Sequence, residues 1–445
     1  MNPKKDTNRL FSAILQDGRF KLAKLLDLFG SISYNGNITY FGKEEMWVEI
    51  SKKCSRVAPS ATLQIDAKAK KMKAEGLDVV GFGAGEPDFD TPSFIIDAAK
   101  EALDQGMTRY TPASGTVKLK KAIVEKFRKD NGLIYDPTQV IVSNGAKHSI
   151  YNTLQAILNI GDEVIIPSPF WVSYPEMVRM ADGVPVSVIT HEEDNFVPRP
   201  SAIEAAVTEK TKAIIINSPN NPCGCVYDKN TLEAIAYLAK KHDFYIISDE
   251  IYEALLYNGQ KHISIASLSE DAYQRTIVIN GVSKSYAMTG WRIGYAAGPK
   301  DVITAMSNYQ SHATSNPNSI AQYAAAAAIE GPKDATKAMV QAFHERRDYM
   351  IATIASIPGL SAKMPGGAFY VMLNIKDILG KRWQNKRIDG SMAFTEALLE
   401  AENVAVVPGD AFEAEGYVRL SYATSMQNIE KGLARIAHFV SELQN

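Results

Sequence analysis

The sequence has 445 residues, with 48 lysines and arginines against 50 aspartates and glutamates, so its formal net charge is −2. This balance of charge excludes the strongly basic surface of a general nucleic-acid-binding protein, and we expect no nucleic-acid partner. Three cysteines are too few for a disulfide framework and form no paired metal-binding motif, so we expect no metal and a reduced, cytoplasmic protein. No apolar stretch approaches the roughly 18 residues that a membrane-spanning helix needs, and no membrane partner is expected.

Residues 1–53 differ from the rest of the chain in their sequence pattern. They contain one short amphipathic pattern over residues 20–29 and a stretch rich in glycine and asparagine over residues 31–42, typical of turns. We interpret residues 1–53 as a weakly ordered N-terminal extension. An interaction arm is the alternative, but no motif in the segment supports it.

Downstream, short apolar runs rich in β-branched residues alternate with helical patterns of ten or more residues. Strands are predicted at residues 78–82, 139–142, 163–166, 212–216, 244–247 and 275–280, and helices at 63–75, 117–131, 149–158 and 229–242. This alternation predicts βαβ units and an α/β domain with a mostly parallel sheet. Residues 335–443 mix long helices with strands at 368–373 and 417–422, which indicates a second, smaller α+β domain.

Polar residues that directly follow the predicted strands are the candidates for function, because ligands of parallel α/β sheets bind beyond the carboxyl ends of the strands. Lys284 follows the strand at 275–280, between a small-residue turn and an apolar segment that contains Arg292. An isolated lysine is usually a solvated surface group. Here its amine could lose water and form Schiff bases, and the guanidinium of Arg292 would require an anion.

Three further strand ends carry polar groups. Asp249 and Tyr252 follow the strand at 244–247. The acidic pair Asp249 and Glu250 can also be a metal ligand, a helix cap or plain surface. Residues 143–147 are small and polar and precede a helix, whose exposed N–H groups can bind a phosphate. Residues 217–224 form a turn rich in proline and asparagine, which alone would be an ordinary loop.

Taken together and in this order, the segments resemble the fold-type-I, pyridoxal-phosphate-dependent class I aminotransferases, over residues 55–445. Bacterial aspartate and aspartate/prephenate aminotransferases are the most similar members. The resemblance rests on residues 59–62 (PSAT), 85–92 (GEPDFDTP), 169–174 (PFWVSY), 248–252 (SDEIY), 287–292 (AMTGWR) and 418–422 (VRLSY).

The resemblance implies a fold with a mostly parallel, seven-stranded type of sheet flanked by helices in the large domain, plus a smaller α+β domain. It places residues 54–94 and 331–445 in the small domain and residues 95–330 in the large, cofactor-binding domain.

The resemblance also implies how the cofactor, pyridoxal 5'-phosphate, is held. Lys284 would form a Schiff base with its aldehyde and afterwards move a proton between the substrate and the cofactor. Asp249 would pair with the pyridine nitrogen and keep it protonated. Tyr252 and Asn221 would hydrogen-bond the phenolic oxygen of the ring, and Trp171 would stack on its face or, as the alternative, merely pack in the core.

For the phosphate, the resemblance implies the backbone of Gly145, Ala146 and Lys147, together with Arg292. Tyr110 would reach the same phosphate from a second subunit, which implies a homodimer with shared active sites. The motif at 217–224 departs from the family, because Cys223 stands where threonine is usual. We expect the thiol to pack there, with the geometry of Asn221 kept and one local hydrogen bond lost.

For the substrate, the resemblance implies that Arg419 clamps the α-carboxylate with two hydrogen bonds while the backbone of Gly85 approaches it, at a place without room for Cβ. Asn221 and Trp171 would border the substrate as well. Thr62 and Lys147 match residues of relatives that accept dicarboxylic substrates. Lys147 would therefore bind a distal carboxylate, although a role confined to the phosphate remains the alternative.

The expected activity is transfer of an amino group between an amino acid, with aspartate and glutamate favoured, and a 2-oxo acid by a ping-pong mechanism. The alternatives on the same fold are a transaminase for prephenate or aromatic amino acids and a β-eliminating lyase. From a different class, a regulator built on an aminotransferase-like sensor would need an N-terminal DNA-binding module. Residues 1–53 carry no helix-turn-helix pattern.

Overall fold

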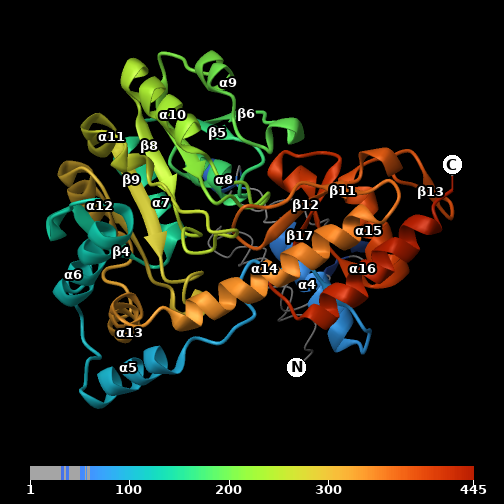
Figure 1. The fold of residues 1–445 in the computed structure, drawn as a ribbon, viewed down its shortest axis with the longest axis horizontal. Helices are drawn as coiled ribbons and strands as arrows, with labels where there is room; N and C mark the ends of the chain where they lie inside the picture. Colours follow the sequence, from blue (N-terminus) through green and yellow to red (C-terminus); the bar gives the residue numbers. More distant parts are fainter. Residues whose placement is uncertain (1–31, 35–36, 40–50, 56, 58–60, 445) are drawn as a thin grey trace. The chain divides into compact units, whose positions relative to one another are not determined.

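The computed structural model describes residues 32–34, 37–39, 51–55, 57 and 61–444 (Figure 1). The chain separates into two compact units, Met1–Ser55 and Arg56–Asn445. In the first unit, β1 (Ile32–Tyr34) pairs antiparallel with β2 (Asn37–Thr39), and α3 covers Lys52–Ser55. The sequence predicted only turns over residues 31–42, because two three-residue strands are too short for a clear alternation. The helix predicted at 20–29 lies outside the described residues.

The second unit contains a seven-stranded sheet with the order β4-β10-β9-β8-β7-β5-β6. Its strands are β4 (Val140–Ser143), β5 (Glu163–Pro167), β6 (Val184–Val188), β7 (Thr211–Asn217), β8 (Tyr245–Asp249), β9 (Thr276–Gly281) and β10 (Gly294–Ala297). The pairs β5–β6, β5–β7, β7–β8 and β8–β9 are parallel, and only β10 runs antiparallel to its neighbours. The predicted α/β class with a mostly parallel sheet is confirmed. β6 and β10 were not predicted, since neither has a long apolar run.

Both faces of this sheet are covered by helices, which explains why its central strands carry consecutive apolar residues. In β7, Ile214 and Ile216 pack on one face with α10 (Lys229–His242), whereas Ala213 and Ile215 pack on the other with α7 (Ala146–Ile157). The other helices of this region are α5 (Ser93–Asp104), α6 (Val117–Lys126), α8 (Ser173–Met180), α9 (Pro200–Ala205), α11 (Glu270–Arg275), α12 (Lys300–Ala313) and α13 (Ser319–Glu330).

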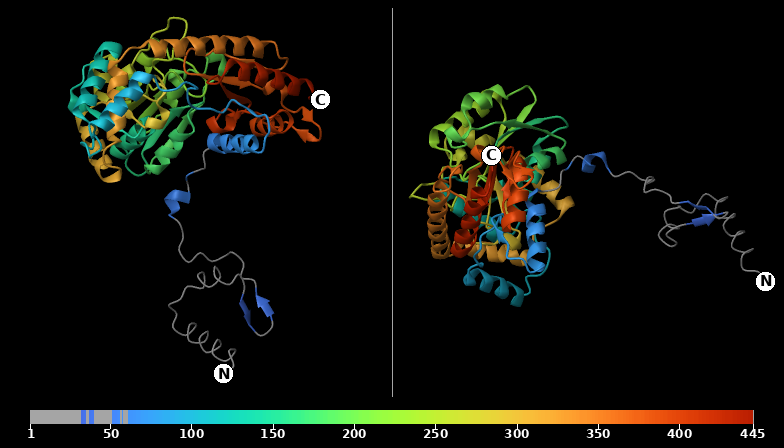
Figure 2. Two further views of the ribbon diagram at one scale, coloured as in Figure 1. Left: turned by 90° about the horizontal axis from the view of Figure 1, so that it is seen from below. Right: turned by 90° about the vertical axis from the view of Figure 1, so that its right-hand side faces the viewer.

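A second, four-stranded sheet has the order β11-β12-β17-β16 and is antiparallel throughout. It consists of β11 (Ser361–Ala362), β12 (Tyr370–Asn374), β16 (Val407–Pro408) and β17 (Tyr417–Ser421), with α15 (Ser391–Glu402) and α16 (Met426–Ser441) beside it. The long helix α14 (Asp334–Ala355) runs from the region of the first sheet toward the second (Figures 1 and 2). The chain before the first sheet joins this second region, because β3 (Val80–Gly81), which follows α4 (Ala61–Ala74), pairs with β15 (Val404–Ala405). A small hairpin is formed by β13 (Arg382–Trp383) and β14 (Lys386–Arg387).

Most element boundaries agree with the sequence predictions to within two residues, and two differ for local reasons. The helix predicted at 149–158 begins three residues earlier, at Ala146, because Gly145 adopts a φ of 89° and lets the chain turn directly from β4 into α7. The helix predicted at 117–131 is α-helical only to Lys126 and continues as a π-helical turn over Phe127–Asn131. No helix among the described residues is both long and apolar enough to cross a membrane.

Candidate functional site

A cavity of 580 Å³ lies beyond the carboxyl ends of β7, β8 and β9 and is closed on its other side by Tyr370 and Arg419 of the second sheet. Ten of the thirteen side chains or backbone positions predicted from the sequence line it. They are Gly85, Ala146, Lys147, Trp171, Asn221, Asp249, Tyr252, Lys284, Arg292 and Arg419. Segments up to 334 residues apart, counted from Gly85 to Arg419, therefore meet in one place.

Asp249 is the last residue of β8 and is buried at the floor of the cavity. Its carboxylate accepts a hydrogen bond from the Tyr174 hydroxyl at 2.6 Å and one from the Ile251 backbone N–H at 3.2 Å. Burial raises the pKa of Asp249 to about 6, although both hydrogen bonds oppose that rise. The Asn217 side chain, opposite in β7, donates to the Asp249 carbonyl at 2.9 Å and fixes the strand end.

Two aromatic side chains, Tyr252 and Trp171, line the same cavity as Asp249. The Tyr252 hydroxyl lies 3.0 Å from the Tyr370 hydroxyl, and burial raises the pKa of Tyr252 well above its usual value, so the phenol stays protonated. The Trp171 ring packs edge-on against Tyr174 and lies under the Lys147 ammonium, which is 4.7 Å from the ring centre. Trp171 thus makes a cation–π contact and remains partly exposed to the cavity.

Lys284 follows β9 and extends its amine into the cavity, where Nζ donates to the Gly85 carbonyl at 2.5 Å. Burial lowers the pKa of Lys284 to about 8; nearby Glu86 opposes this shift, and the positive charges of Arg292 and Arg419 add to it. A lysine in this condition is a better nucleophile and proton acceptor near neutral pH than an ordinary surface lysine.

The first anion-binding element is the start of α7. Gly145 precedes the helix, and a Cβ on it would lie 2.5 Å from Arg292 Nη2, so only glycine lets the guanidinium approach the helix N-terminus. Arg292 donates to the carbonyls of Thr289 and Asn144 at 3.0 and 3.3 Å. The backbone N–H groups at the helix N-terminus, that of Lys147 included, and the guanidinium of Arg292 together form a positively charged site that suits a phosphate.

The second anion-binding element is Arg419, which lies in the middle of β17 and is buried. It donates to Asn221 Oδ1 at 3.0 Å and to the Gly83 carbonyl at 2.9 Å, and its Nε has no partner among the described residues. Burial lowers the pKa of Arg419, which shows that its charge is poorly compensated. A buried guanidinium with an unused N–H is arranged for an incoming carboxylate.

The turn at Cys223 differs from the sequence expectation in one detail. We expected a hydrogen bond to be lost with the cysteine, but the thiol donates to Asn220 Oδ1 at 3.0 Å, and the Cys223 backbone N–H donates to the same oxygen at 3.1 Å. The thiol is a weak donor, yet it can take the geometric place of a hydroxyl. Asn221, two residues before Cys223, donates its backbone N–H to Asn217 Oδ1 at 2.8 Å.

Three predicted residues are not among those that line the cavity. Gly145 contacts the Arg292 guanidinium at the start of α7, as described above. Tyr110 is 91% exposed and makes no contribution to the cavity within this chain. Thr62 lies in the first turn of α4, and its side chain is outside the described residues.

Sequence reasoning missed three residues that contact the predicted ones. Tyr174 supports Asp249, Tyr370 contacts Tyr252, and Asn217 holds both Asp249 and Asn221. Tyr174 lies in one of the motifs quoted above, so a search for partners of the buried carboxylate could have found it. Asn217 begins the turn at 217–224 noted above, but its contacts with Asp249 and Asn221 could not be read from the sequence. Tyr370 gave no signal, because its partner Tyr252 is 118 residues away.

A comparison with protein families matches residues 77–436 to the family described as aminotransferase class I and II. The chain is 51% identical over 395 residues to the aspartate aminotransferase of Bacillus subtilis, covering 89% of this chain and all of that protein. It is 48% identical over 392 residues to the aspartate/prephenate aminotransferase of Thermus thermophilus, covering 87% of this chain and 98% of that protein.

Solved structures give the same result for the fold. The crystal structure of the aspartate aminotransferase of Rhizobium meliloti has a TM-score of 0.87 at 41% identity, covering 89% of this chain and all of that one. The structure of the Thermus thermophilus aspartate aminotransferase with maleate has a TM-score of 0.83 at 47% identity, covering 88% of this chain and all of that one.

Proposed function

The chain belongs to the class I and II aminotransferases, and on that premise we propose that it moves the amino group of aspartate or glutamate to a 2-oxo acid with pyridoxal 5'-phosphate as cofactor. The amino acid and the oxo acid would occupy one site in turn, in a ping-pong mechanism. The observation that carries this proposal is the position of Lys284. Its amine shares one cavity with both anion-binding elements and with the buried Asp249, and the charges of Arg292, Arg419 and Asp249 all act on it.

The chemistry of the cavity walls fits this cofactor. Arg292 and the α7 N-terminus would hold the phosphate, where the close approach at Gly145 leaves no room for a Cβ. Asp249, which has no cationic hydrogen-bond partner among the described residues, would accept a hydrogen bond from the protonated ring nitrogen. Tyr252 and Asn221 would hold the phenolic oxygen, and Trp171 would lie along the ring.

Bound in this site, pyridoxal 5'-phosphate supplies an aldehyde for amines and a ring that accepts the electrons released at the substrate Cα. The chain supplies the proton transfers. With a pKa of about 8, roughly a tenth of the Lys284 amine is neutral at pH 7, so Nζ can take the proton that leaves Cα and deliver it again. Asp249 keeps the ring nitrogen protonated because a carboxylate there favours the positive ring.

The charges of the cavity support an acidic substrate. Arg419 would bind the α-carboxylate and Arg292 the phosphate, which leaves Lys147 for a third anionic group. A substrate with a second carboxylate supplies that group. The relatives named as aspartate aminotransferases and the relative solved with maleate, a dicarboxylate, agree with this assignment.

A half-reaction experiment tests the proposal directly. The purified yellow protein is mixed with one amino acid at a time, and conversion to the pyridoxamine form is followed by absorbance. We expect aspartate and glutamate to convert the protein faster than phenylalanine or alanine. Faster conversion by phenylalanine would favour an aromatic transaminase. Release of both pyruvate and ammonia from an amino acid that carries a thiol leaving group on Cβ, such as cystathionine, would identify a β-lyase.

Prephenate is a second candidate acceptor, because it carries two carboxylates and relatives 44–48% identical to this chain are named aspartate/prephenate aminotransferases. The same protein in its pyridoxamine form can be mixed with prephenate or with oxaloacetate. Conversion rates within tenfold of each other would establish both as acceptors.

We propose further that the protein is a homodimer with shared sites. Tyr110 supports this, because a tyrosine that is 91% exposed in one chain is available to a neighbouring subunit. Tyr110→Phe is then expected to weaken cofactor affinity, whereas Tyr237→Phe, at another exposed tyrosine, should leave it unchanged. Sedimentation of the cofactor-loaded protein as a monomer would contradict the shared site.

We expect the reactivity of Lys284 to follow its lowered pKa. In the full chain freed of cofactor, trapping of pyridoxal by borohydride at this lysine should increase with pH through a midpoint of about 8, because only the neutral amine attacks an aldehyde. Since the pKa is lowered from 10.5, the reactive form appears at a lower pH than for surface lysines. The variant Lys284→Ala gives the background, and a midpoint near 10.5 would contradict the assignment.

Lys147→Ala should separate dicarboxylic from other substrates. We expect kcat/KM for aspartate to fall roughly 10- to 100-fold, because a charge-assisted contact is worth about 1.5–3 kcal/mol, whereas the value for alanine should change less than threefold. Lys212→Ala is the matched control, since Lys212 also lies over an aromatic ring, that of Tyr245, outside the cavity. Equal losses for both substrates would assign Lys147 to the phosphate.

A further inference from the structure

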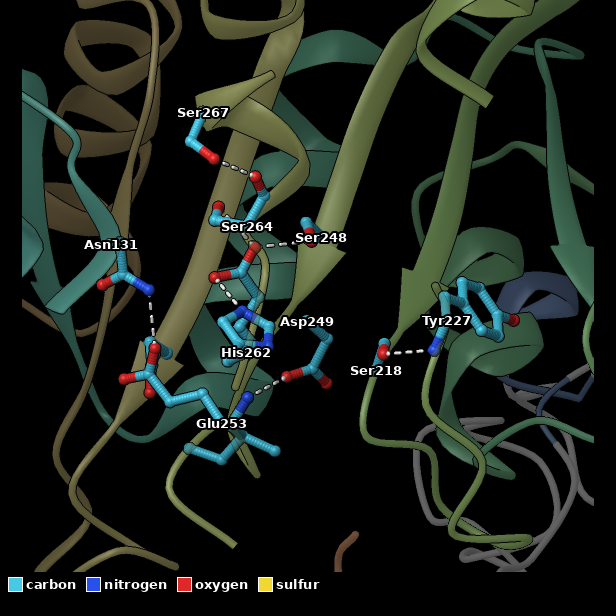
Figure 3. A network of polar contacts seen from close by, with 12 residues as sticks. Asn131, Ser218, Tyr227, Ser248, Asp249, Glu253, His262, Ser264 and Ser267 are labelled. Atoms are coloured by element: carbon cyan, nitrogen blue, oxygen red, sulfur yellow. Dashed lines mark hydrogen bonds and ion pairs between the residues drawn. The ribbon is translucent and has the colours of Figure 1, made fainter. Parts of the chain in front are cut away.

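A second group of ionisable side chains is buried beside Asp249 but does not line the cavity. Glu250 and Glu253 follow Asp249 in the chain, His262 comes from the loop that returns to the sheet, and Lys126 ends α6. In Figure 3 the His262 ring and the Glu253 carboxylate both lie to the left of the Asp249 carboxylate. The side chains of all four are at most 11% exposed, so their charges must be compensated locally.

Glu250 is the centre of this group. Its Oε2 lies 2.9 Å from His262 Nε2, and its Oε1 accepts hydrogen bonds from Ser248 at 2.9 Å and Ser264 at 2.7 Å (Figure 3). Neither Oε2 nor Nε2 has a hydrogen-bond partner elsewhere in the described part of the chain. A proton on Nε2 can therefore be donated to Glu250 Oε2, which accepts no other hydrogen bond from the described residues.

Glu253 completes the group from the other side. It forms an ion pair with Lys126 and accepts a hydrogen bond from Asn131 at 2.9 Å, and Lys126 also donates to Asn131 at 2.7 Å. Ligand atoms of Glu250, Glu253 and His262 lie within 4.8 Å of one another, as metal ligands do. Lys126 already supplies Glu253 with a positive charge, so the group needs no cation for balance.

The charges of the group cancel only if His262 is protonated. Burial by itself would lower the pKa of His262, but attraction to Glu250 and Glu253 outweighs burial and raises it above its usual value. With a neutral imidazole, one uncompensated negative charge would stand next to Asp249. The charge of Glu250 already adds to the burial that raises the pKa of Asp249, while Tyr174 and Lys284 oppose the rise.

We propose that Glu250 and His262 are positioning residues for Asp249: they anchor the turn that carries its carboxylate, and the positive His262 offsets the negative charge of Glu250 beside it. This proposal rests on the proposed function, in which Asp249 faces the ring nitrogen of the cofactor. The anchoring is local, because the Glu250 backbone N–H also donates to Ile279 of β9 at 2.9 Å. Four further ionisable residues interact with these buried side chains, namely Tyr135, Tyr286, Tyr295 and Lys333, and Asp130 acts on the last three of them.

The test is a double-mutant cycle in which the affinity for pyridoxal 5'-phosphate is measured as a function of pH. Dissociation constants are measured between pH 5 and 8.5 for the full chain freed of cofactor, as wild type, His262→Gln, Glu250→Gln and the double variant. Wild-type affinity should weaken on acidification as Asp249 takes up a proton, with a pKa of about 6. The ionisations of the cofactor itself are common to all four proteins and cancel in the comparison.

We expect His262→Gln to move the midpoint of this loss upward by about one pH unit, because a negative charge is left beside Asp249. Glu250→Gln should leave the midpoint in place or lower it, and the double variant should return to within about 0.3 unit of wild type. His242→Gln is the control, since His242 pairs with Glu204 elsewhere on the chain and should cause no shift. A double variant shifted further upward than His262→Gln would show a merely structural role and overturn the proposal.

If His262→Gln does not fold, the charge of His262 can be measured without it. Histidine titrations by NMR on the full-length wild type should show that the His262 imidazole stays protonated above pH 6.5. In Glu250→Gln the same imidazole should lose its proton at a lower pH. An imidazole of His262 that is neutral at pH 6.5 in the wild type would overturn the proposal. Failure of the wild type to bind the cofactor at any pH would instead contradict the proposed function.

Discussion

Lys284→Ala is expected to abolish aminotransfer, with a loss in kcat of at least about 10⁴-fold, and to remove covalent trapping of the cofactor at this position. In the proposed function one amine both binds the aldehyde and moves the Cα proton, and a positioned acid–base group alone contributes roughly 10²–10⁴-fold. Steady-state rates with aspartate and borohydride trapping followed by peptide mass analysis measure the two losses.

The stability of the Lys284→Ala protein separates chemistry from folding. The amine is surrounded by protein, and burial lowers its pKa to about 8, so removing it relieves a desolvated charge. We expect the cofactor-free variant to unfold within a few degrees of the cofactor-free wild type. Lys300→Ala, at the exposed first residue of α12, is the matched control and should keep full activity. Turnover by Lys284→Ala above one hundredth of wild type would remove the lysine from its assigned role.

Arg419→Lys is expected to lower kcat/KM for every amino acid by roughly 10²–10³-fold, mainly through KM. The substitution keeps the charge but loses the two-pronged geometry, and truncating one partner of a buried charge pair costs about 2–5 kcal/mol. It also breaks the contact with Asn221 Oδ1 at 3.0 Å, which joins the two sides of the cavity. Because the α-carboxylate is common to all amino acids, aspartate and alanine should suffer alike.

This uniform loss distinguishes Arg419 from Lys147, whose removal should affect dicarboxylic substrates alone. Cofactor absorbance of Arg419→Lys should equal that of the wild type, since the guanidinium is separate from the phosphate element at Arg292. Arg382→Lys, in the exposed β13, provides a control for the chemical change itself. A selective loss for aspartate would show that Arg419 binds the distal carboxylate instead.

Much of the fold and of the candidate site followed from local sequence patterns. Apolar runs such as residues 212–216 identify buried parallel strands, because both faces of such a strand pack against helices. Lys284 and Asp249 could be proposed because functional groups of α/β proteins gather where strands end, and that position can be read from the chain. The role of Asn221 came from the family resemblance, and all three residues line one cavity.

Tertiary structure decided what those groups contact. The pairing of Tyr252 with Tyr370, of Arg419 with Asn221 and of His262 with Glu250 joins residues 118, 198 and 12 positions apart. Such contacts depend on how sheets and loops pack, and packing leaves no periodic pattern in the sequence. The sequence by itself therefore determined which chemical groups this protein has and where most of its strands lie along the chain. Only the folded chain determined the order of the strands in the sheet and the pKa values of the site, since burial and distant charges set these values, and the raised pKa of Asp249 is the clearest case.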